Sequence, residues 1–331
     1  MALPYTKRFP TALAALVLLA AATAGSVHAE GAPYPAKPVR VVVHSGAGGP
    51  PDLLIRVVAP EMARRLGQPL FVDNKPGAAG AIGIGEVARA APDGYTIGFA
   101  NATTLAINQS LYSKLPYDAE RQLAPIGLIG FVSNALVVRS SSSFRSIDDL
   151  LNYAKRNPGK LSMGSSGNGG TGHLSGELFK AKAGISMLHV PYRGSAAAVQ
   201  DLVGGMVDLM FENISMVLPQ IQSGQLRALA VTSKERSPLL PAVPTVMEAG
   251  LPSYEMVAWG GLVAPAGTSP DIIATLNRAL NQSLDDPVVK KRLSELGTET
   301  STGEPERLFT LARKERPIWA EIVKFSNAKM D

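Results

Sequence analysis

A glycine-rich stretch at residues 161–179 carries the residue types that most clearly suggest chemistry. It reads LSMGSSGNGGTGHLSGELF, with five glycines between residues 164 and 172 and hydroxyl or amide side chains among them. Glycine lets the backbone approach a bound group closely. Apolar residues at helical spacing follow from Leu174, which places the free N–H groups and the positive dipole end of a helix around the loop. The stretch therefore predicts an anion-binding loop between a strand and a helix.

The sequence of this stretch is similar to two better-known motifs but matches neither of them. A phosphate-binding P-loop has Lys and then Ser or Thr directly after its last glycine, whereas Gly170 and Thr171 follow Gly169 here. A hydrolase nucleophile elbow around Ser166 needs glycine two residues later, where this chain has Asn168. Glycine and serine also form ordinary turns, so a tight strand-to-helix connection without a ligand remains an alternative.

Other expected strands also end in glycine or small polar residues. The apolar run at residues 39–43 predicts a buried parallel strand. A second glycine-rich loop, residues 44–52, follows it, and Asp52 is expected to cap the next helix. Further strands are expected at residues 95–100, 136–139, 187–190 and 207–211. Helical patterns alternate with these strands, which predicts parallel sheets with a binding site where the strands end.

The histidines and serines do not form a recognisable metal or catalytic pattern. His44, His173 and His189 lie on separate segments without ligand spacing, and the chain has no cysteine, so neither a metal nor a cofactor is expected. For His173, a ligand-facing role and a structural hydrogen bond to the turn both remain open, whereas His189 is expected to be structural. Ser45 and Ser166 have a histidine nearby in sequence but no evident acid as a third member.

The N-terminus and the composition indicate an exported globular protein. Lys7 and Arg8 precede an apolar run, and small residues lead to Ala29, so a signal peptide over residues 1–29 is expected. The chain has 331 residues, 46% of them hydrophobic, which fits about two domains. The absence of cysteine fits a bacterial periplasm. Basic residues are scattered without an aromatic platform, so no nucleic-acid partner is expected.

Several sequence blocks follow one another in a characteristic order. They are residues 73–78 (DNKPGA), 91–95 (APDGY), 189–194 (HVPYRG), 226–231 (LRALAV) and 264–268 (APAGT). In these blocks the mature chain resembles the Bug or TctC-like receptors, the substrate-binding proteins of tripartite tricarboxylate transporters. The resemblance implies an α/β periplasmic-binding-protein fold of type II, with two lobes around a cleft and a hinge that the chain crosses twice. Lobe I would comprise residues 30–131 and 255–331, and lobe II residues 132–254.

The resemblance also implies which residues line the ligand. Small and polar residues of four loops, with one arginine and one strand-end asparagine, are the expected contacts: Ser45, Gly48, Gly49, Asn101, Thr103, Ser166, Asn168, Gly169, Thr171, His173, Arg193, Ser195 and Asn213. Backbone N–H groups and hydroxyls would hold a carboxylate without a full counter-charge. The first loop departs from the family pattern at Pro51, which has neither a hydroxyl nor an N–H group.

The function implied by the resemblance is that of a non-enzymatic receptor. It would be a monomer that captures a small organic carboxylate in the periplasm and presents it to membrane transporter subunits. Two alternatives stay open: a ligand-sensing subunit of a signalling receptor, and an exported serine hydrolase that uses Ser166 or Ser45.

Overall fold

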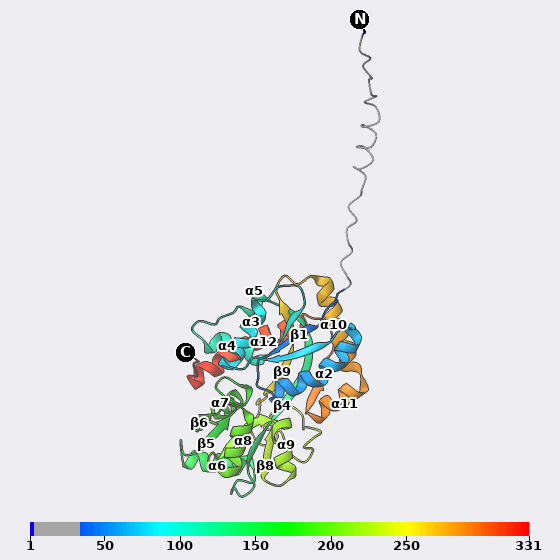
Figure 1. The fold of residues 1–331 in the computed structure, drawn as a ribbon. Coiled ribbons are helices and arrows are strands. Elements are labelled where there is room, and N and C mark those ends of the chain that lie inside the picture. Colours follow the sequence, from blue (N-terminus) through cyan, green and yellow to red (C-terminus); the bar gives the residue numbers. More distant parts are fainter. Residues whose placement is uncertain (3–33, 331) are drawn as a thin grey trace.

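The structure is a computed structural model that describes residues 1–2 and 34–330. The expected signal peptide, residues 1–29, lies outside the described residues apart from its first two. Over the described part, ten strands form one sheet, whose main path runs in the order β2-β1-β3-β9-β4-β7-β5-β6, with β8 and β10 off this path and each paired to β4. Helices and strands gather into an upper and a lower body around this path (Figure 1).

We call the upper body lobe I. Its strands are β1 (Val39–Val43), β2 (Leu70–Asn74), β3 (Thr96–Asn101), β9 (Val257–Pro265) and β10 (Thr298–Thr300). Its helical segments are α2 (Pro50–Leu66), η1 (Ala78–Gly80), α3 (Ala81–Ala88), η2 (Thr103–Ile107), α4 (Asn108–Leu111), α5 (Ala119–Gln122), α10 (Pro270–Asp285), α11 (Pro287–Glu295) and α12 (Arg307–Ser326). The central strand β1 is parallel to both β2 and β3, as the buried apolar run predicts.

We call the lower body lobe II. Its strands are β5 (Ser162–Ser165), β6 (Leu188–Pro191), β7 (Leu209–Asn213) and β8 (Leu226–Val231), and its helices are α6 (Ile147–Arg156), α7 (Thr171–Ala183), α8 (Ser195–Gly204) and α9 (Ile214–Gln222). Strand β5 is parallel to β6 and β7. The helix α7 lies very close to β7, because a Cβ atom on Gly172 would be 2.3 Å from the Phe211 carbonyl oxygen.

One long strand, β4 (Leu123–Arg139), belongs to both lobes. As far as Ser133 it pairs with β9, and from Asn134 onward it pairs with β7 and β8. The chain returns to lobe I near Met256, whose N–H donates to the Thr232 carbonyl at 2.9 Å. The chain therefore crosses between the lobes at two adjacent places. The exact lobe limits expected from the sequence stay a prediction.

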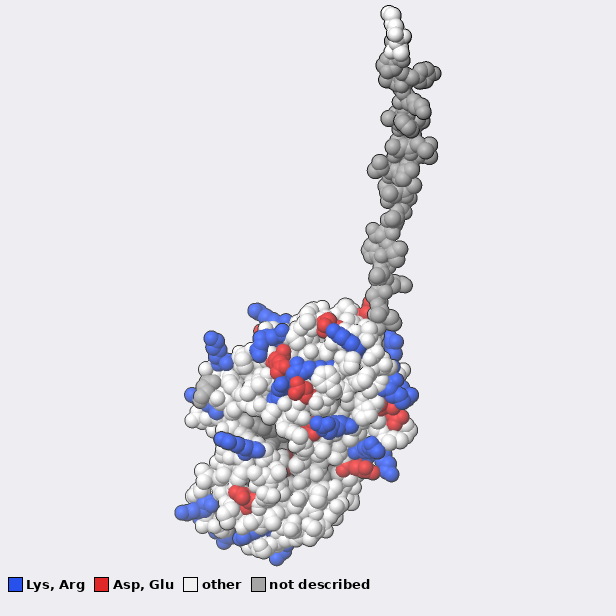
Figure 2. Space-filling view, viewed as in Figure 1, with Lys and Arg blue, Asp and Glu red and all other residues white. Residues whose placement is uncertain are grey.

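Other contacts also join the lobes. Helix α12 packs against α7, and a Cβ atom on Gly169 of lobe II would be 2.3 Å from Leu111 Cδ1 of lobe I. The surface is indented where the lobes meet, and side chains of both charge signs are interspersed on this face (Figure 2). Among the helices of residues 34–330, none combines the length and apolarity needed to cross a membrane.

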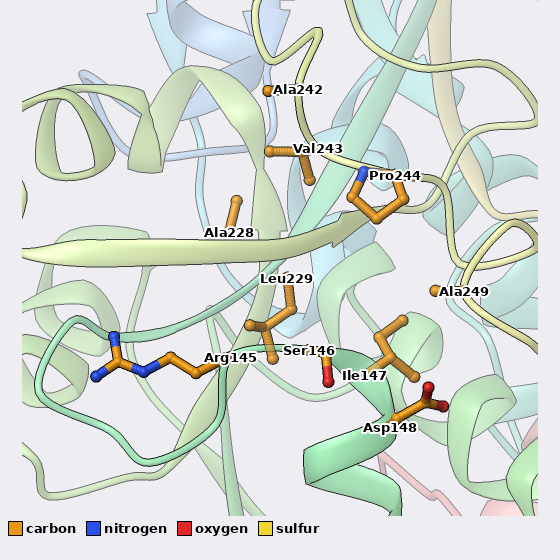
Figure 3. Close-up of a pocket in the computed structure, with 10 residues that line it drawn as sticks. All are labelled: Arg145, Ser146, Ile147, Asp148, Ala228, Leu229, Ala242, Val243, Pro244 and Ala249. Atoms are coloured by element: carbon orange, nitrogen blue, oxygen red, sulfur yellow. The ribbon is translucent and has the colours of Figure 1, made fainter.

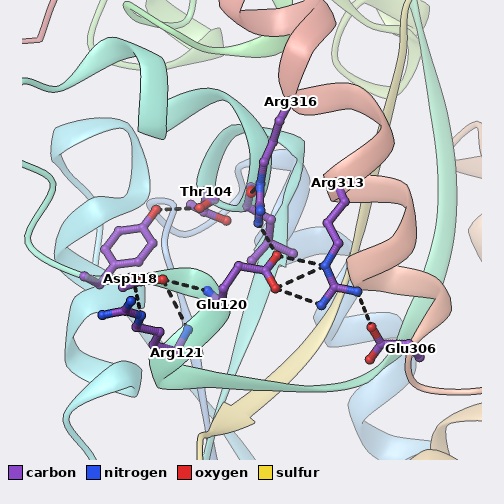
Figure 4. Close-up of polar contacts among 9 residues, drawn as sticks. Thr104, Asp118, Glu120, Arg121, Glu306, Arg313 and Arg316 are labelled. Carbon is purple, nitrogen blue, oxygen red and sulfur yellow. Dashed lines mark hydrogen bonds and ion pairs between the residues drawn. The ribbon is translucent and has the colours of Figure 1, made fainter.

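An ion-pair cluster fixes α12 on lobe I. Glu120 of α5 pairs with Arg313 at 2.8 Å and with Arg316 at 2.7 Å, and Arg313 also pairs with Glu306 at 2.6 Å (Figure 4). These side chains neutralise one another, so we assign the cluster to the packing of α5 against α12 and not to a ligand.

Candidate functional site

The glycine-rich stretch connects β5 to α7, as its sequence predicts. Gly170 is the N-cap of α7, with φ −70° and ψ 162°, and no side chain caps the helix. The first N–H groups of α7, starting at Thr171, therefore have no partner within the helix. They face the loop together with the positive end of the helix dipole, which is an arrangement that favours an anion.

A second helix start lies beside the first. Gly194, with φ 110°, precedes α8, which also lacks a side-chain cap. The Gly194 N–H donates to the Ser166 carbonyl at 3.2 Å, and the Tyr192 N–H donates to the Ser165 carbonyl at 2.9 Å. The predicted contacts Ser166 and Ser195 thus come from two loops that are hydrogen-bonded to each other.

The first loop of lobe I, residues 44–52, offers fewer backbone N–H donors than the two loops of lobe II. Helix α2 begins with Pro50 and Pro51 after the N-cap Gly49, and proline has no N–H group. The expected cap, Asp52, is instead the third helical residue. Its carboxylate accepts from the Gly48 N–H at 2.8 Å and from Asn74 Nδ2 at 2.9 Å. Burial alone would raise the pKa of Asp52, but Arg56 and these hydrogen bonds outweigh it, so the pKa is lowered.

Several buried polar atoms just after β1, within β4 and at the end of β7 have no hydrogen-bond partner among the described residues. In lobe I they are His44 Nε2 and Ser45 Oγ, and near the lobe crossing they are Asn134 Oδ1, Glu212 Oε2 and Asn213 Oδ1. Burial lowers the pKa of His44 to about 4, so this ring is neutral. Buried polar groups normally have a partner, so these atoms mark the end of β1 and the β4–β7 pairing at Asn134 and Asn213 as places where water or a ligand binds.

Sequence reasoning did not find Asn134. Its Nδ2 donates to Ser175 Oγ at 3.0 Å, and the same hydroxyl donates to the Thr171 carbonyl at 2.7 Å. These bonds fix the amide so that Oδ1 is the unpartnered acceptor. Asn134 is the Cα partner of Asn213 in the β4–β7 pair. The only sequence signal was an asparagine immediately before an apolar run.

An ionised carboxylate at Glu212 would repel an anion bound beside it. It is 3% exposed, and burial raises its pKa to about 7, although the Asn213 N–H and the Ser195 hydroxyl favour the charged form. Its Oε1 accepts from the Asn213 N–H at 2.9 Å. At neutral pH this carboxyl group is therefore partly protonated and repels an anion less than an ordinary glutamate would.

The remaining predicted residues are placed as follows. Asn101 lies at the end of β3, where its Oδ1 accepts from the Thr104 N–H at 3.2 Å, and Thr103 is buried beside it. Asn168 and Arg193 are exposed, and Gly169 is buried. His173 is buried and its Nδ1 accepts from the Gly169 N–H at 3.0 Å. This is the structural bond to the turn that the sequence left as one alternative.

Two surface pockets lie away from these residues. One, of about 250 Å³, lies in lobe II between the start of α6, β8 and residues 242–249 (Figure 3). The other, of about 710 Å³, lies in lobe I along α10. Neither is lined by any predicted ligand residue. Within the described residues, no group of three or more His, Cys, Asp or Glu is placed to hold a metal ion.

Comparisons with known proteins agree with this architecture. The family model described as tripartite tricarboxylate transporter family receptor matches residues 54–327. A protein from the intergenic region tcbD-tcbE of Pseudomonas sp. is 40% identical over 291 residues, 88% of this chain and 86% of that protein. Protein BugT of Bordetella pertussis is 36% identical over 322 residues, 97% of this chain and 99% of that protein.

Solved structures are also similar. A Rhodopseudomonas palustris protein with adipate is 35% identical, with a TM-score of 0.85 over 89% of this chain and 99% of that one. MatC from the same species with bound malate is 33% identical, with a TM-score of 0.82 over 88% and 100%. Periplasmic binding protein BugD is 38% identical, with a TM-score of 0.82 over 89% and 99%. The two-lobe periplasmic-binding-protein fold expected from the sequence is confirmed.

Proposed function

Because this chain belongs to the tripartite tricarboxylate transporter receptor family and is similar in structure to periplasmic binding protein BugD, we propose that it captures a small organic carboxylate for a transporter of that type. The Bug or TctC-like resemblance is thus confirmed. The proposal includes export by the signal peptide at residues 1–29, action as a monomer and delivery to membrane subunits of the transporter.

The observation that carries the proposal is the meeting of two uncapped helix starts in lobe II. The N-terminal N–H groups of α7 and α8 lie beside two hydrogen-bonded loops. A carboxylate accepting several such bonds needs no lysine or arginine as a counter-ion. Lobe I offers fewer donors because of Pro50 and Pro51, so we infer that lobe II holds the carboxylate and lobe I closes over it.

The ligands of relatives support a carboxylate. One of the similar structures is a protein with adipate, and another is MatC with bound malate. Both are dicarboxylates of modest size, and one of them carries a hydroxyl group. Unpartnered acceptors such as Asn134 Oδ1 can accept a hydrogen bond from a hydroxyl group directly or through an ordered water.

A receptor explains the serine and histidine contacts better than a hydrolase does. Within the described residues, Ser165 Oγ lies 2.6 Å from His189 Nε2. Ser165 is fully buried and its hydroxyl also donates to the Gly167 carbonyl at 3.1 Å, which leaves it no path to a substrate. The non-enzymatic role belongs to the proposal, and the signalling subunit stays an alternative.

A thermal-shift screen of the mature protein tests the proposal. The panel holds mono-, di- and tricarboxylates, including adipate and malate, together with their neutral amides. We expect one or more acids to raise the melting temperature, since ligand at a hundredfold excess over Kd stabilises the folded state by about 2.7 kcal/mol. Amides that stabilise as well as their acids, or stabilisation by neutral compounds alone, would contradict a carboxylate site.

Replacing Thr171 with Pro tests the role of the α7 start. Proline fits the first position of a helix and removes its N–H group, and Gly170 has the extended backbone that proline requires of the preceding residue. A hydrogen bond to a charged group is worth about 1.5–3 kcal/mol. We therefore expect a roughly 10- to 100-fold loss of carboxylate affinity in calorimetric titration.

The control for this change is Thr171→Val, which keeps the N–H group and removes the hydroxyl. It separates a backbone contact from a side-chain contact at the same position. Wild-type affinity in the Pro variant, with an unchanged melting temperature without ligand, would show that the carboxylate does not bind at the start of α7.

A further inference from the structure

Asn134 has one polar atom that no other described residue satisfies. Its backbone N–H donates to Thr232 Oγ1 at 2.9 Å, and its carbonyl oxygen accepts from the Thr232 N–H at 2.9 Å. Its Nδ2 donates to Ser175 Oγ at 3.0 Å. The residue is 0% exposed, and Oδ1 is buried without a partner. Three of its four polar groups are therefore paired by the fold, and the fourth is an acceptor closed to solvent.

The orientation of this amide follows from its neighbours. The Ser175 hydroxyl has a single proton, which it donates to the Thr171 carbonyl at 2.7 Å. Ser175 Oγ can therefore only accept from Asn134, so the atom that faces it is Nδ2 and not Oδ1. Turning the amide over would place Oδ1 against Ser175 Oγ with no hydrogen between them. The free acceptor is thus a consequence of the hydrogen-bond network.

This acceptor lies beside the start of α7. Ser175 joins Asn134 to Thr171, the first residue of that helix. Ser175 is about one turn, or about 5.4 Å, from Thr171 along the helix, so Asn134 contacts α7 at about that distance from its first N–H groups. A substituent close to a carboxylate spans such a distance when the carboxylate binds at the helix start.

A second free acceptor lies across the strand pair. Asn213 is the Cα partner of Asn134, so both side chains are on one face of the sheet, with Cβ atoms about 4.5–5.5 Å apart. Asn213 Oδ1 is buried and has no partner among the described residues. Asn213 is the N-cap of α9, but its side chain makes no capping bond. Strand β7 ends at Asn213 and is parallel to β5, after which the loop to α7 begins, so both oxygens lie at the loop's edge of lobe II.

These two amide oxygens can only accept hydrogen bonds. A carboxylate also has only acceptor oxygens, so it satisfies neither of them, whereas a hydroxyl or ammonium group donates to them. A buried acceptor that stays unpaired weakens a complex, and a site that hydrogen-bonds a hydroxyl group rejects the analogue that lacks it. The two asparagines therefore favour a ligand that combines a carboxylate with a donor group.

We propose that Asn134, together with Asn213, selects organic acids that carry a hydroxyl or ammonium group close to the carboxylate. Asn134 is a specificity-determining residue: its Oδ1 accepts from this donor group while the start of α7 holds the carboxylate. The inference rests on the proposed function, because it requires the carboxylate to bind at α7. It is also narrower than that function, since a carboxylate can bind at α7 whether or not another group reaches Asn134.

Matched acids test the inference in the wild-type mature protein. Calorimetric titration compares malate, aspartate, methylsuccinate and succinate, which share one carbon chain and differ in a single hydroxyl, ammonium, methyl or hydrogen substituent. The corresponding 2-hydroxy, 2-amino and 2-methyl derivatives of adipate, with adipate itself, repeat the comparison on a longer chain, and both enantiomers are used. We expect the hydroxy or the amino acid to bind more tightly than the methyl and unsubstituted acids by roughly tenfold or more. The tighter of the two identifies the donor group.

The outcomes separate this inference from the proposed function. Methyl or unsubstituted acids that bind within about threefold of the hydroxy and amino acids would show that no ligand donor reaches Asn134, and so would tight binding confined to acids without a donor group. Either result would overturn the inference and leave the carboxylate proposal standing. If no acid binds, the carboxylate proposal itself fails, and the inference fails with it.

Two variants test the residues. Asn134→Leu has nearly the same shape without polar atoms, and we expect the preference for the hydroxy or amino acid over the methyl acid to fall below about threefold. Asn213→Leu, which removes no capping bond, should also reduce this preference and serves if Asn134→Leu does not fold. Asn152→Leu changes an exposed asparagine on α6 and should keep the wild-type preference. A preference that survives in Asn134→Leu and in Asn213→Leu would overturn the assignment to these residues.

Discussion

Replacing Glu212 with Gln is expected to raise the free energy of unfolding by about 3 kcal/mol at pH 8.5 and by less than about 1 kcal/mol at pH 4.5. Glu212 is 3% exposed, and burial raises its pKa from 4.5 to about 7. Glutamine has nearly the same shape, and its carbonyl oxygen can still accept from the Asn213 N–H. It removes the cost of ionising a carboxyl group at a site where Oε2 has no partner.

The pH range follows from the direction of this shift. Below about pH 4.5 Glu212 is protonated in both the folded and the unfolded chain, so it does not lower stability there. As the pH rises from 4.5 to 7, Glu212 ionises in the unfolded chain but stays largely protonated in the folded one. The stability associated with the protonated carboxyl group is therefore progressively lost. Above pH 7 the difference between wild type and the Gln variant stays constant.

Urea unfolding of both proteins at several pH values measures this difference. The matched control is Glu321→Gln, which changes an exposed glutamate on α12 and should leave stability within about 0.5 kcal/mol at each pH. A stability difference for Glu212→Gln that does not change with pH would show that the pKa of Glu212 in the folded protein is not raised above its value in the unfolded chain.

The local features of this fold could be predicted from the sequence. The apolar run at residues 39–43 is β1, and the glycine-rich stretch is the loop between β5 and α7. These predictions depend on neighbouring residues, so a single sequence is sufficient. Asp52 was placed wrongly as the cap of α2, because Pro50 and Pro51 fit the first helical turn and the helix begins with them.

The long strand β4 was the main omission in the expected elements. Only residues 136–139 were expected as a strand, whereas β4 begins at Leu123. Pro125, Gly127 and Gly130 interrupt the strand pattern, and the register of β4 against β9 shifts at these residues. Tertiary packing requires glycine at position 130, because a Cβ atom there would be 2.1 Å from the Glu299 carbonyl oxygen in β10.

The unpartnered acceptors could not be predicted for a similar reason. Asn134 and Ser175 are far apart in sequence, and only the β4–β7 register and the packing of α7 bring Asn134, Asn213 and Ser175 together. From the sequence alone, Glu212 is an ordinary acidic residue at the end of an expected strand. Its raised pKa depends on burial, which is a property of the tertiary fold.

Replacing Glu315 with Ala is expected to lower the free energy of unfolding by about 3 kcal/mol. Glu315 Oε2 accepts from Trp259 Nε1 at 2.8 Å and from Trp319 Nε1 at 3.0 Å. The two tryptophans are 2% and 5% exposed, so alanine would leave two buried indole N–H groups without a partner, each at a cost of about 1–3 kcal/mol. Burial raises the pKa of Glu315, and loss of this unfavourable desolvation offsets part of the cost.

Glu315→Gln separates hydrogen bonding from charge at this site. Both indoles donate to the same oxygen, so the single carbonyl oxygen of glutamine can accept both bonds, and we expect a loss below about 1 kcal/mol. The chain has two tryptophans, so intrinsic fluorescence during urea unfolding reports directly on this site. Trp259 is the Cα partner of Phe131, next to the place where β4 enters lobe II. Equal destabilisation by Ala and by Gln would mean that the charge of Glu315, and not its hydrogen bonds, anchors α12 beside the lobe crossing.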